Sequence, residues 1–274
     1  MWWPALDRLR FVDMLHGAVV TLGPTGEPTR TGVGSTIAAV IRPRVDGGAI
    51  VATERHLALA AQEDLSDLTP VIELFLPAQP LGSPRTALRC NEGGCDPQGR
   101  FYVGTMAYNR QRGVAQLYRW NGTAKHAVLT GLTIANGLAW SPGGDRAYFN
   151  DTETGTTSQL DYVDGQLTRR REFVRFPPLQ GRPDGLTVDA EGGVWVALNQ
   201  GGKIHRYSPD GELTEVIDLP VRQVTSCTFG GPGLDRLYIT TSREGLPDTA
   251  EPAAGSIFVA DPGVRGLPVV PFAG

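Results

Sequence analysis

The chain has 274 residues, of which 41% are apolar and 20% are charged, so its composition is that of a globular protein with a large buried core. Its formal net charge of -4 is spread over scattered acidic and basic residues. That pattern excludes a basic stripe for nucleic acid and a polybasic membrane anchor. We therefore expect a small-molecule partner, and neither nucleic acid nor a membrane. The sequence gives no indication of the oligomeric state.

Cysteine use and the first residues indicate the compartment. The cysteines are odd in number, Cys90, Cys95 and Cys227, and Met1 is followed by WWPALDRLRF, which lacks the charged and apolar regions of a secretion signal. We expect a reduced, cytoplasmic protein.

A turn followed by an apolar run recurs six times along the chain. The six copies read ALDRLRFVDM, VDGGAIVATE, DPQGRFYVGT, SPGGDRAYFN, DAEGGVWVAL and PGLDRLYITT. They start at Asp7, Gly47, Gly99, Asp145, Gly192 and Asp235, at intervals of 40 to 52 residues. A period in the forties built from strands and tight turns is typical of propeller blades. The sequence therefore predicts an all-β protein, a six-bladed β-propeller that occupies residues 1–274 as a single domain.

A shorter strand precedes four of these turns, and the same count along it reaches a polar residue each time. Eight residues before a glycine of the turn lie Asn91, Asn136, Asp184 and Thr225. Equivalent positions in successive blades lie at the same height along the central channel of a propeller. We therefore expect Asn91, Asn136 and Asp184 to face one central channel. Amide and carboxylate oxygens suit a hard divalent cation such as Ca²⁺, Mg²⁺ or Mn²⁺. In the second blade the count reaches Ala39 or Val40, which makes that wall apolar and leaves room for a ligand.

The same residues allow a simpler interpretation. Asn-Gly and Asp-Gly dipeptides favour turns, so Asn136-Gly137 and Asp184-Gly185 could start hairpins without binding anything. Taken singly, each dipeptide favours the turn. Three polar residues at one register favour the site, and the two interpretations can hold together at the mouth of a channel.

The motifs around these residues resemble a known family. RCNEGGCDPQGRFYVGTM, ANGLAWSPGGDRAYFND, GRPDGLTVDAEGGVWVA, TSCTFGG and DPGVRGLP are similar, in this order, to the senescence marker protein, gluconolactonase and luciferin-regenerating enzyme family. The resemblance implies a six-bladed propeller with one divalent metal ion, whether calcium, zinc, manganese or magnesium. It also implies hydrolysis of sugar lactones to aldonic acids.

The resemblance also assigns roles to particular residues. Asn136 of ANG and Asp184 of PDG match two metal ligands, and Asp184 also matches the family's general acid/base. Arg89 and Asn91 of RCN match the substrate-binding pair. Asn109, just past GTM, aligns with a residue that contacts substrate in some members.

The chain departs from the family pattern in two places. Glu92 stands where the family usually has Asp. The family's metal-binding Glu belongs to a G-E-x-P-x-W segment whose Trp matches Trp2, so that Glu would lie about three residues before Met1. The repeat leaves the same gap, because the first blade lacks its first strand and the polar residue on it. We expect either a start inside the gene at a GTG codon, which the preference for arginine over lysine favours, or a site with two ligands.

The cysteines, histidines and aromatic residues are better explained by packing than by a binding or catalytic site. Cys90 and Cys95 have no second close pair for a zinc site, and the histidines His16, His56, His126 and His205 are isolated in the sequence. Neither a G-x-S-x-G elbow nor a P-loop occurs in the sequence. The aromatic residues of the repeats are expected in the core.

The sequence thus predicts a metal-dependent hydrolase that opens a sugar lactone to the aldonic acid. Asp184 would take the proton from the attacking water while the metal polarises the carbonyl, and Arg89 and Asn91 would orient the sugar ring. Two alternatives remain: a non-enzymatic propeller that binds metal or protein, and a hydrolase of organophosphates or other esters on the same metal.

Overall fold

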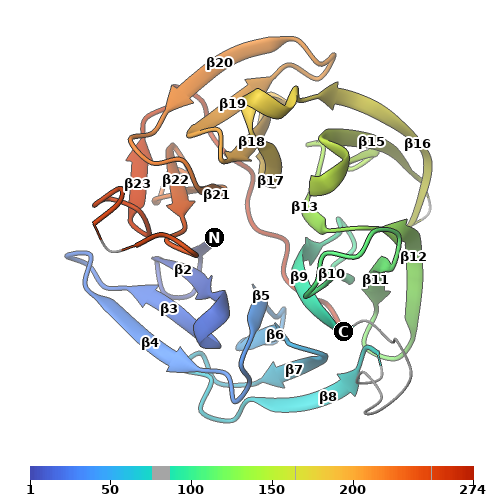
Figure 1. The fold of residues 1–274 in the computed structure, drawn as a ribbon. Helices are drawn as coiled ribbons and strands as arrows, with labels where there is room; N and C mark the ends of the chain where they lie inside the picture. The colour runs from blue at the N-terminus through green and yellow to red at the C-terminus, as the bar shows by residue number, and fades with distance from the viewer. Residues whose placement is uncertain (76–86, 164, 248) are drawn as a thin grey trace. The chain divides into compact units, whose positions relative to one another are not determined.

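The computed structural model describes residues 1–274 except 76–86, 164 and 248 (Figure 1). The described residues form 23 β-strands in six antiparallel sheets, five of four strands and one of three. Within this described part, the helical elements are three short 3₁₀ helices, η1 (Met14–His16), η2 (Thr152–Thr154) and η3 (Pro178–Gln180). The predicted fold class, a six-bladed β-propeller, is confirmed.

The chain divides into two compact units, which are described separately. Unit 1 comprises Met1, Trp3–Ala135 and Val269–Gly274. Apart from Trp2, it holds the first three sheets, whose strands are β1 (Trp2–Trp3), β2 (Arg8–Asp13), β3 (Ala18–Leu22), β4 (Pro28–Gly32), β5 (Ala38–Pro43), β6 (Ala49–Thr53), β7 (His56–Ala60), β8 (Thr69–Glu73), β9 (Leu88–Cys95), β10 (Phe101–Ala107), β11 (Ala115–Trp120) and β12 (Lys125–Leu132).

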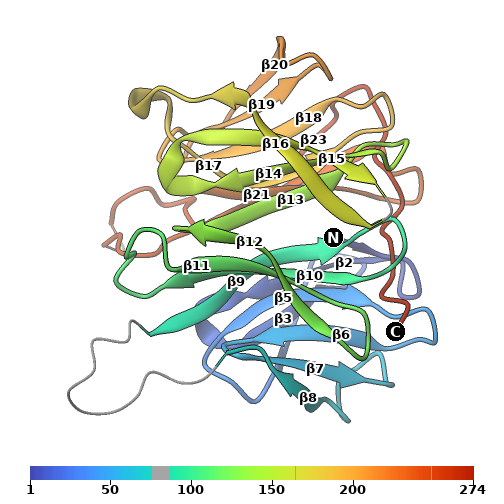
Figure 2. The same cartoon turned by 90° about the vertical axis from the view of Figure 1, so that its right-hand side faces the viewer.

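Unit 2 comprises Trp2 and Asn136–Pro268. It holds the last three sheets, whose strands are β13 (Ala135–Trp140), β14 (Arg146–Asp151), β15 (Thr156–Val163), β16 (Gln166–Arg175), β17 (Arg182–Val188), β18 (Val194–Asn199), β19 (Lys203–Tyr207), β20 (Leu213–Asp218), β21 (Val224–Gly230), β22 (Arg236–Thr241) and β23 (Ile257–Ala260). Within each sheet consecutive strands pair, as Figure 2 shows for β9 to β12.

Each apolar run of the repeat is the second strand of its sheet: β2, β6, β10, β14, β18 and β22. Val194, Trp195 and Val196 of β18 are completely buried, so both faces of this strand are covered. The first strand of the first sheet, β1, has two residues. The repeat predicted from the sequence is therefore confirmed as the unit of one sheet.

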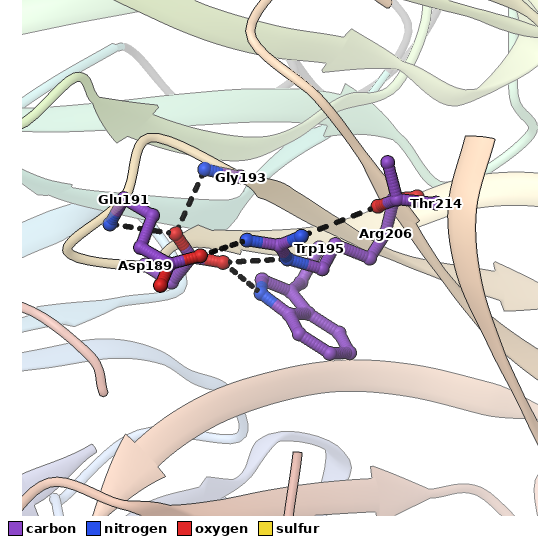
Figure 3. A network of polar contacts seen from close by, with 6 residues as sticks. All are labelled: Asp189, Glu191, Gly193, Trp195, Arg206 and Thr214. Atoms are coloured by element: carbon purple, nitrogen blue, oxygen red, sulfur yellow. Dashed lines mark hydrogen bonds and ion pairs between the residues drawn. The ribbon is translucent and has the colours of Figure 1, made fainter. Parts of the chain in front are cut away.

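A buried carboxylate organises the turn between β17 and β18 (Figure 3). Asp189, with no exposed surface, accepts hydrogen bonds from the backbone N–H groups of Glu191 and Gly193 at 2.9 and 2.8 Å. Its other oxygen accepts from Trp195 Nε1 and Arg206 Nε, both at 2.8 Å. A buried charge is tolerated when it is paired and fully hydrogen-bonded. This Asp therefore fixes the turn, the tryptophan and the third strand together.

The core of the second and third sheets includes a residue from the end of the sequence. Phe272 is fully buried, and its ring stacks on that of Trp120 with the centroids 5.1 Å apart. It also makes a T-shaped contact with the ring of Phe101, whose centroid is 6.4 Å away. Its backbone N–H donates to Pro43 O, and its carbonyl accepts from Val45 N. Residues 269–274 therefore belong to the core of unit 1.

First strands of neighbouring sheets in unit 2 approach each other closely at two glycines. A Cβ on Gly137 of β13 would lie 2.6 Å from Leu186 N and 2.7 Å from Asp184 O of β17. A Cβ on Gly185 would lie 2.2 Å from Ser226 Oγ of β21. A Cβ atom does not make non-bonded contacts that short, so both positions need glycine.

This contact corrects the interpretation of Asn136-Gly137 and Asp184-Gly185 as turns. Both dipeptides lie inside strands β13 and β17, and neither glycine has a positive φ. Glycine is required here by the close approach of the next strand, and not by a left-handed turn.

We expect Phe272→Ala to lower the free energy of unfolding by about 3 to 5 kcal/mol, because it empties a closed aromatic site. Tryptophan fluorescence during urea titration measures the change, since Trp120 stacks on this ring. Val45→Ala is the matched control, because Val45 is 60% exposed. Equal unfolding midpoints for the two variants would contradict the proposed role of Phe272 in the core.

We expect Gly137→Ala to lower the midpoint of thermal unfolding and the yield of folded protein, since the backbone of β17 must move to admit the methyl group. The cost of such overpacking is about 1 to 3 kcal/mol or more. Gly32→Ala is the control: it also lies in a strand, and its Cβ would meet nothing within 4 Å. If the two variants are equally stable, the strands can separate without cost.

Candidate functional site

Asn136 and Asp184 lie on neighbouring first strands of unit 2. Asn136 is on β13 and Asp184 on β17, and the bare backbone at Gly137 holds these strands together. Asn136 is buried, with 7% of its surface exposed, and Asp184 is half-buried. The two predicted metal ligands therefore come from adjacent sheets, as the eight-residue count indicated.

Thr152 sets the orientation of the Asn136 amide. Asn136 Nδ2 donates to Thr152 Oγ1 at 3.0 Å, and Thr152 is itself buried at the start of η2, immediately after β14. Because the amide group is planar, this bond turns Asn136 Oδ1 away from Thr152. The oxygen, and not the nitrogen, is presented on the opposite side.

Asp184 is held at both its side chain and its backbone. Asn199 Nδ2, at the end of β18, donates to Asp184 Oδ2 at 2.8 Å. Asn150 Nδ2 donates to the Asp184 carbonyl at 2.6 Å, and Thr157 Oγ1 fixes Asn150 through its Oδ1 at 2.7 Å. These bonds restrict the carboxylate before any ligand binds.

The donor set of Asn136 and Asp184 fits a hard cation. One carboxamide oxygen and one carboxylate oxygen are ligands that such cations prefer, and water or substrate can complete the coordination. In the part of the chain that the structure describes, no group of three His, Cys, Asp or Glu side chains gathers as a metal site. Thr225, at the fourth register position, bonds Thr240 Oγ1 at 2.8 Å within its own sheet.

Arg89 and Asn91 lie on β9, the first strand of the third sheet in unit 1. Arg89 Nη1 donates to Asn91 Oδ1 at 2.9 Å and to Cys90 O at 3.0 Å, and lies 3.1 Å from Met14 Sδ. Asn91, which is 6% exposed, donates from Nδ2 to Ala135 O at 2.9 Å. The structure therefore joins the two residues of the predicted substrate-binding pair by a direct hydrogen bond.

Tyr108 stands beside Arg89 and links it to Glu54. Tyr108, the first residue after β10, donates from its hydroxyl to Glu54 Oε1, and its ring centre lies 5.9 Å from Arg89 Cζ. Partial burial, followed by the hydrogen bond to Glu54, raises the pKa of Tyr108 to about 12. The phenol therefore stays protonated and remains a donor at neutral pH.

Asn109 has a local role in the structure. It is exposed, and its Oδ1 accepts from Gln111 N at 3.1 Å in the turn after β10. This bond fixes the start of the turn. A contact between Asn109 and substrate stays a prediction.

Sequence reasoning missed the residues that hold these side chains: Glu54, Tyr108, Thr152 and Asn199. Glu54, Tyr108 and Thr152 each follow directly after the second strand of a sheet, and Asn199 ends one. Antiparallel pairing brings such positions beside the start of the first strand, as in Met106 opposite Arg89 and Asn199 opposite Arg182. The signal was therefore present as the position just past each apolar run.

The remaining sequence interpretations concern packing. Cys90, Cys95 and Cys227 are buried free thiols, and burial raises the pKa of Cys95 to about 12. His205 is buried and its Nδ1 lies 2.9 Å from Tyr207 Oη.

None of the described helices is long and apolar enough to cross a membrane.

The chain is similar to proteins of known activity or structure. It is 31% identical over 279 residues to a pentonolactonase of Haloferax volcanii, covering 98% of this chain and 91% of that protein. It is 36% identical over 199 residues to an L-arabinolactonase of Azospirillum brasilense, covering 70% of this chain and 66% of that protein. A regucalcin of Agrobacterium tumefaciens, described as a calcium-binding protein, superposes with a TM-score of 0.90 at 25% identity, covering 100% of this chain and 92% of that one.

The match to a family covers most of the chain. Residues 1–243 match the family described as the SMP-30/Gluconolactonase/LRE-like region. With the six sheets and the lactonase relatives, this match settles the relationship that the five sequence motifs indicated. The chain belongs to the SMP-30/gluconolactonase/LRE-like family.

Proposed function

We propose that this protein hydrolyses a sugar lactone to the aldonic acid, with a divalent metal ion as cofactor. The observation that carries the proposal is the pair Asn136 and Asp184, two oxygen donors on adjacent strands, each oriented by a second polar side chain. The pentonolactonase and L-arabinolactonase relatives support a lactone as the substrate.

The metal would be held by Asn136 Oδ1 and the carboxylate of Asp184. A divalent cation bound there would polarise the lactone carbonyl and favour deprotonation of a water. The description of the regucalcin relative as a calcium-binding protein supports calcium among the candidate ions.

The chain's own residues supply the proton transfer and the binding. Asp184 accepts a proton from the attacking water, and Asn199 keeps the carboxylate in one rotamer while it does so. Holding the base in place beforehand spares the entropy of fixing it during the reaction. Thr152 likewise keeps the side chain of Asn136 in one orientation.

Arg89 and Asn91 bind the substrate in this proposal. Arg89 is a donor of several hydrogen bonds, and the hydroxyl and ring oxygens of a sugar lactone are acceptors. The bond between Arg89 and Asn91 restricts both side chains in the free protein. Asn109 is proposed as a further substrate contact on the family resemblance alone.

We expect Asp184→Ala to lower kcat for a pentono-1,4-lactone by about 10² to 10⁴, the usual contribution of a general base. Exhaustive chelation should abolish activity, and added Ca²⁺, Mn²⁺, Mg²⁺ or Zn²⁺ should restore it. Proton release at constant pH measures the rate. Asp145→Ala is the control, because Asp145 is an exposed carboxylate in the turn before β14.

The outcome separates the candidate functions. Full activity after chelation, or an unchanged rate in Asp184→Ala, would contradict the metal-dependent mechanism. Metal binding without hydrolysis of any lactone would favour a binding scaffold. Turnover of a phosphotriester in preference to every lactone would identify the organophosphate alternative.

We expect Arg89→Ala to raise KM by about ten- to a hundredfold, since hydrogen bonds to charged groups contribute about 1.5 to 3 kcal/mol. The value of kcat should change less, because Arg89 has no part in the proton transfer. Arg89→Lys should recover part of the affinity by restoring the charge without the fork of donors. Steady-state kinetics on one lactone tests this, and a loss confined to kcat would exclude a substrate-binding role.

A further inference from the structure

Side chains from three sheets of unit 1 are linked to Arg89, either directly or through Tyr108. We call this group the Arg89 cluster, and its members are Met14, Glu54, Arg89, Asn91 and Tyr108. Met14, Glu54 and Tyr108 each follow directly after the second strand of a sheet, namely β2, β6 and β10. The cluster is therefore formed at equivalent positions of the three sheets.

Backbone contacts fix Glu54 within this group. Its carbonyl accepts from Cys90 N at 2.8 Å, which ties it to β9, and its own N–H donates to Ser35 Oγ at 3.3 Å. The carboxylate accepts from Tyr108 Oη, and the face of that ring is turned to Arg89. Tyr108 thus contacts a negative side chain through its hydroxyl group and a positive side chain through its ring.

The cluster is open to solvent on the side of these groups. Tyr108 is 48% exposed, and Glu54 and Arg89 are half-buried, whereas Asn91 is buried. All three of these residues therefore keep solvent-exposed surface, from which a small molecule can approach them.

The chemistry of the cluster distinguishes two kinds of sugar lactone. A hydroxyl group both donates and accepts, so it can give a hydrogen bond to the Glu54 carboxylate and accept one from Arg89. A carboxylate group on the ligand only accepts, and near Glu54 it meets a like charge. Rejection of a ligand by a like charge is a common source of specificity.

We propose that Glu54, held by Tyr108, makes the Arg89 cluster select uncharged sugar lactones over lactones that carry a carboxylate. This inference rests on the proposed lactone hydrolysis and names its substrate class. Arg89 alone would attract an acidic lactone. Glu54 cancels that attraction and replaces it with a site for hydroxyl groups.

The test compares D-glucono-1,4-lactone with D-glucaro-1,4-lactone, which differ only in a terminal CH₂OH or carboxylate. The ratio of kcat/KM for the neutral over the acidic lactone should be above one in the unaltered protein. In Glu54→Gln the ratio should fall by about tenfold or more, because tenfold corresponds to about 1.4 kcal/mol, and two like charges about 4 Å apart repel by more than that at an effective dielectric constant near 20. Glu54→Asp, which keeps the charge, should retain most of the ratio.

Two more variants complete the set. Tyr108→Phe should lower the ratio, because it releases the Glu54 carboxylate, and a ratio equal to that of the unaltered protein would contradict the holding role of Tyr108. Glu73→Gln is the charge control on β8, and it should leave the ratio unchanged. A ratio that stays constant in Glu54→Gln, or falls equally in Glu73→Gln, would overturn the proposal.

A binding measurement separates this inference from the proposed function. The affinities of both lactones are measured by saturation-transfer NMR in the Asp184→Ala background, with and without Glu54→Gln. If no lactone is hydrolysed but binding shows the predicted ratio, the proposed function fails and the selectivity stands. If hydrolysis occurs with an unchanged ratio, the selectivity alone fails, and absence of both hydrolysis and binding contradicts the two together.

Discussion

The contact between bare backbone at Gly137 and strand β17 is the constraint on which the candidate ligands of unit 2 depend. It sets the spacing of the two strands that carry Asn136 and Asp184. A methyl group there would push the strands apart, and the two oxygen donors would move with them. The hydrogen bonds from Thr152 and Asn199 then only adjust side chains whose backbones are already in place.

The fold could be predicted from the sequence because its signals are local. Each apolar run lies next to its own turn. The burial of a strand can be predicted from a few consecutive apolar residues, as in Val194, Trp195 and Val196. The register of Asn136 and Asp184 could be counted for the same reason, since both lie a fixed number of residues before a turn. Their family roles came from longer motifs that span the same turns.

The rest depends on contacts that no local pattern encodes. The Asn-Gly and Asp-Gly dipeptides favoured turns, and only the approach of a neighbouring strand shows why glycine is needed inside β13 and β17. Glu54 and Tyr108 are ordinary polar residues in the sequence, and their pairing requires two sheets to be placed beside each other. Asn109 shows the opposite case, because a local turn accounts for its hydrogen bond.

Phe272 also has a consequence for the way the protein is made. The ring it stacks on, that of Trp120, belongs to a sheet that is synthesised long before residues 269–274. A ribosome releases the chain from the N terminus onward, so the aromatic face of Trp120 stays uncovered until residues 269–274 emerge. During that interval it offers chaperones and other nascent chains an apolar surface that the finished protein hides.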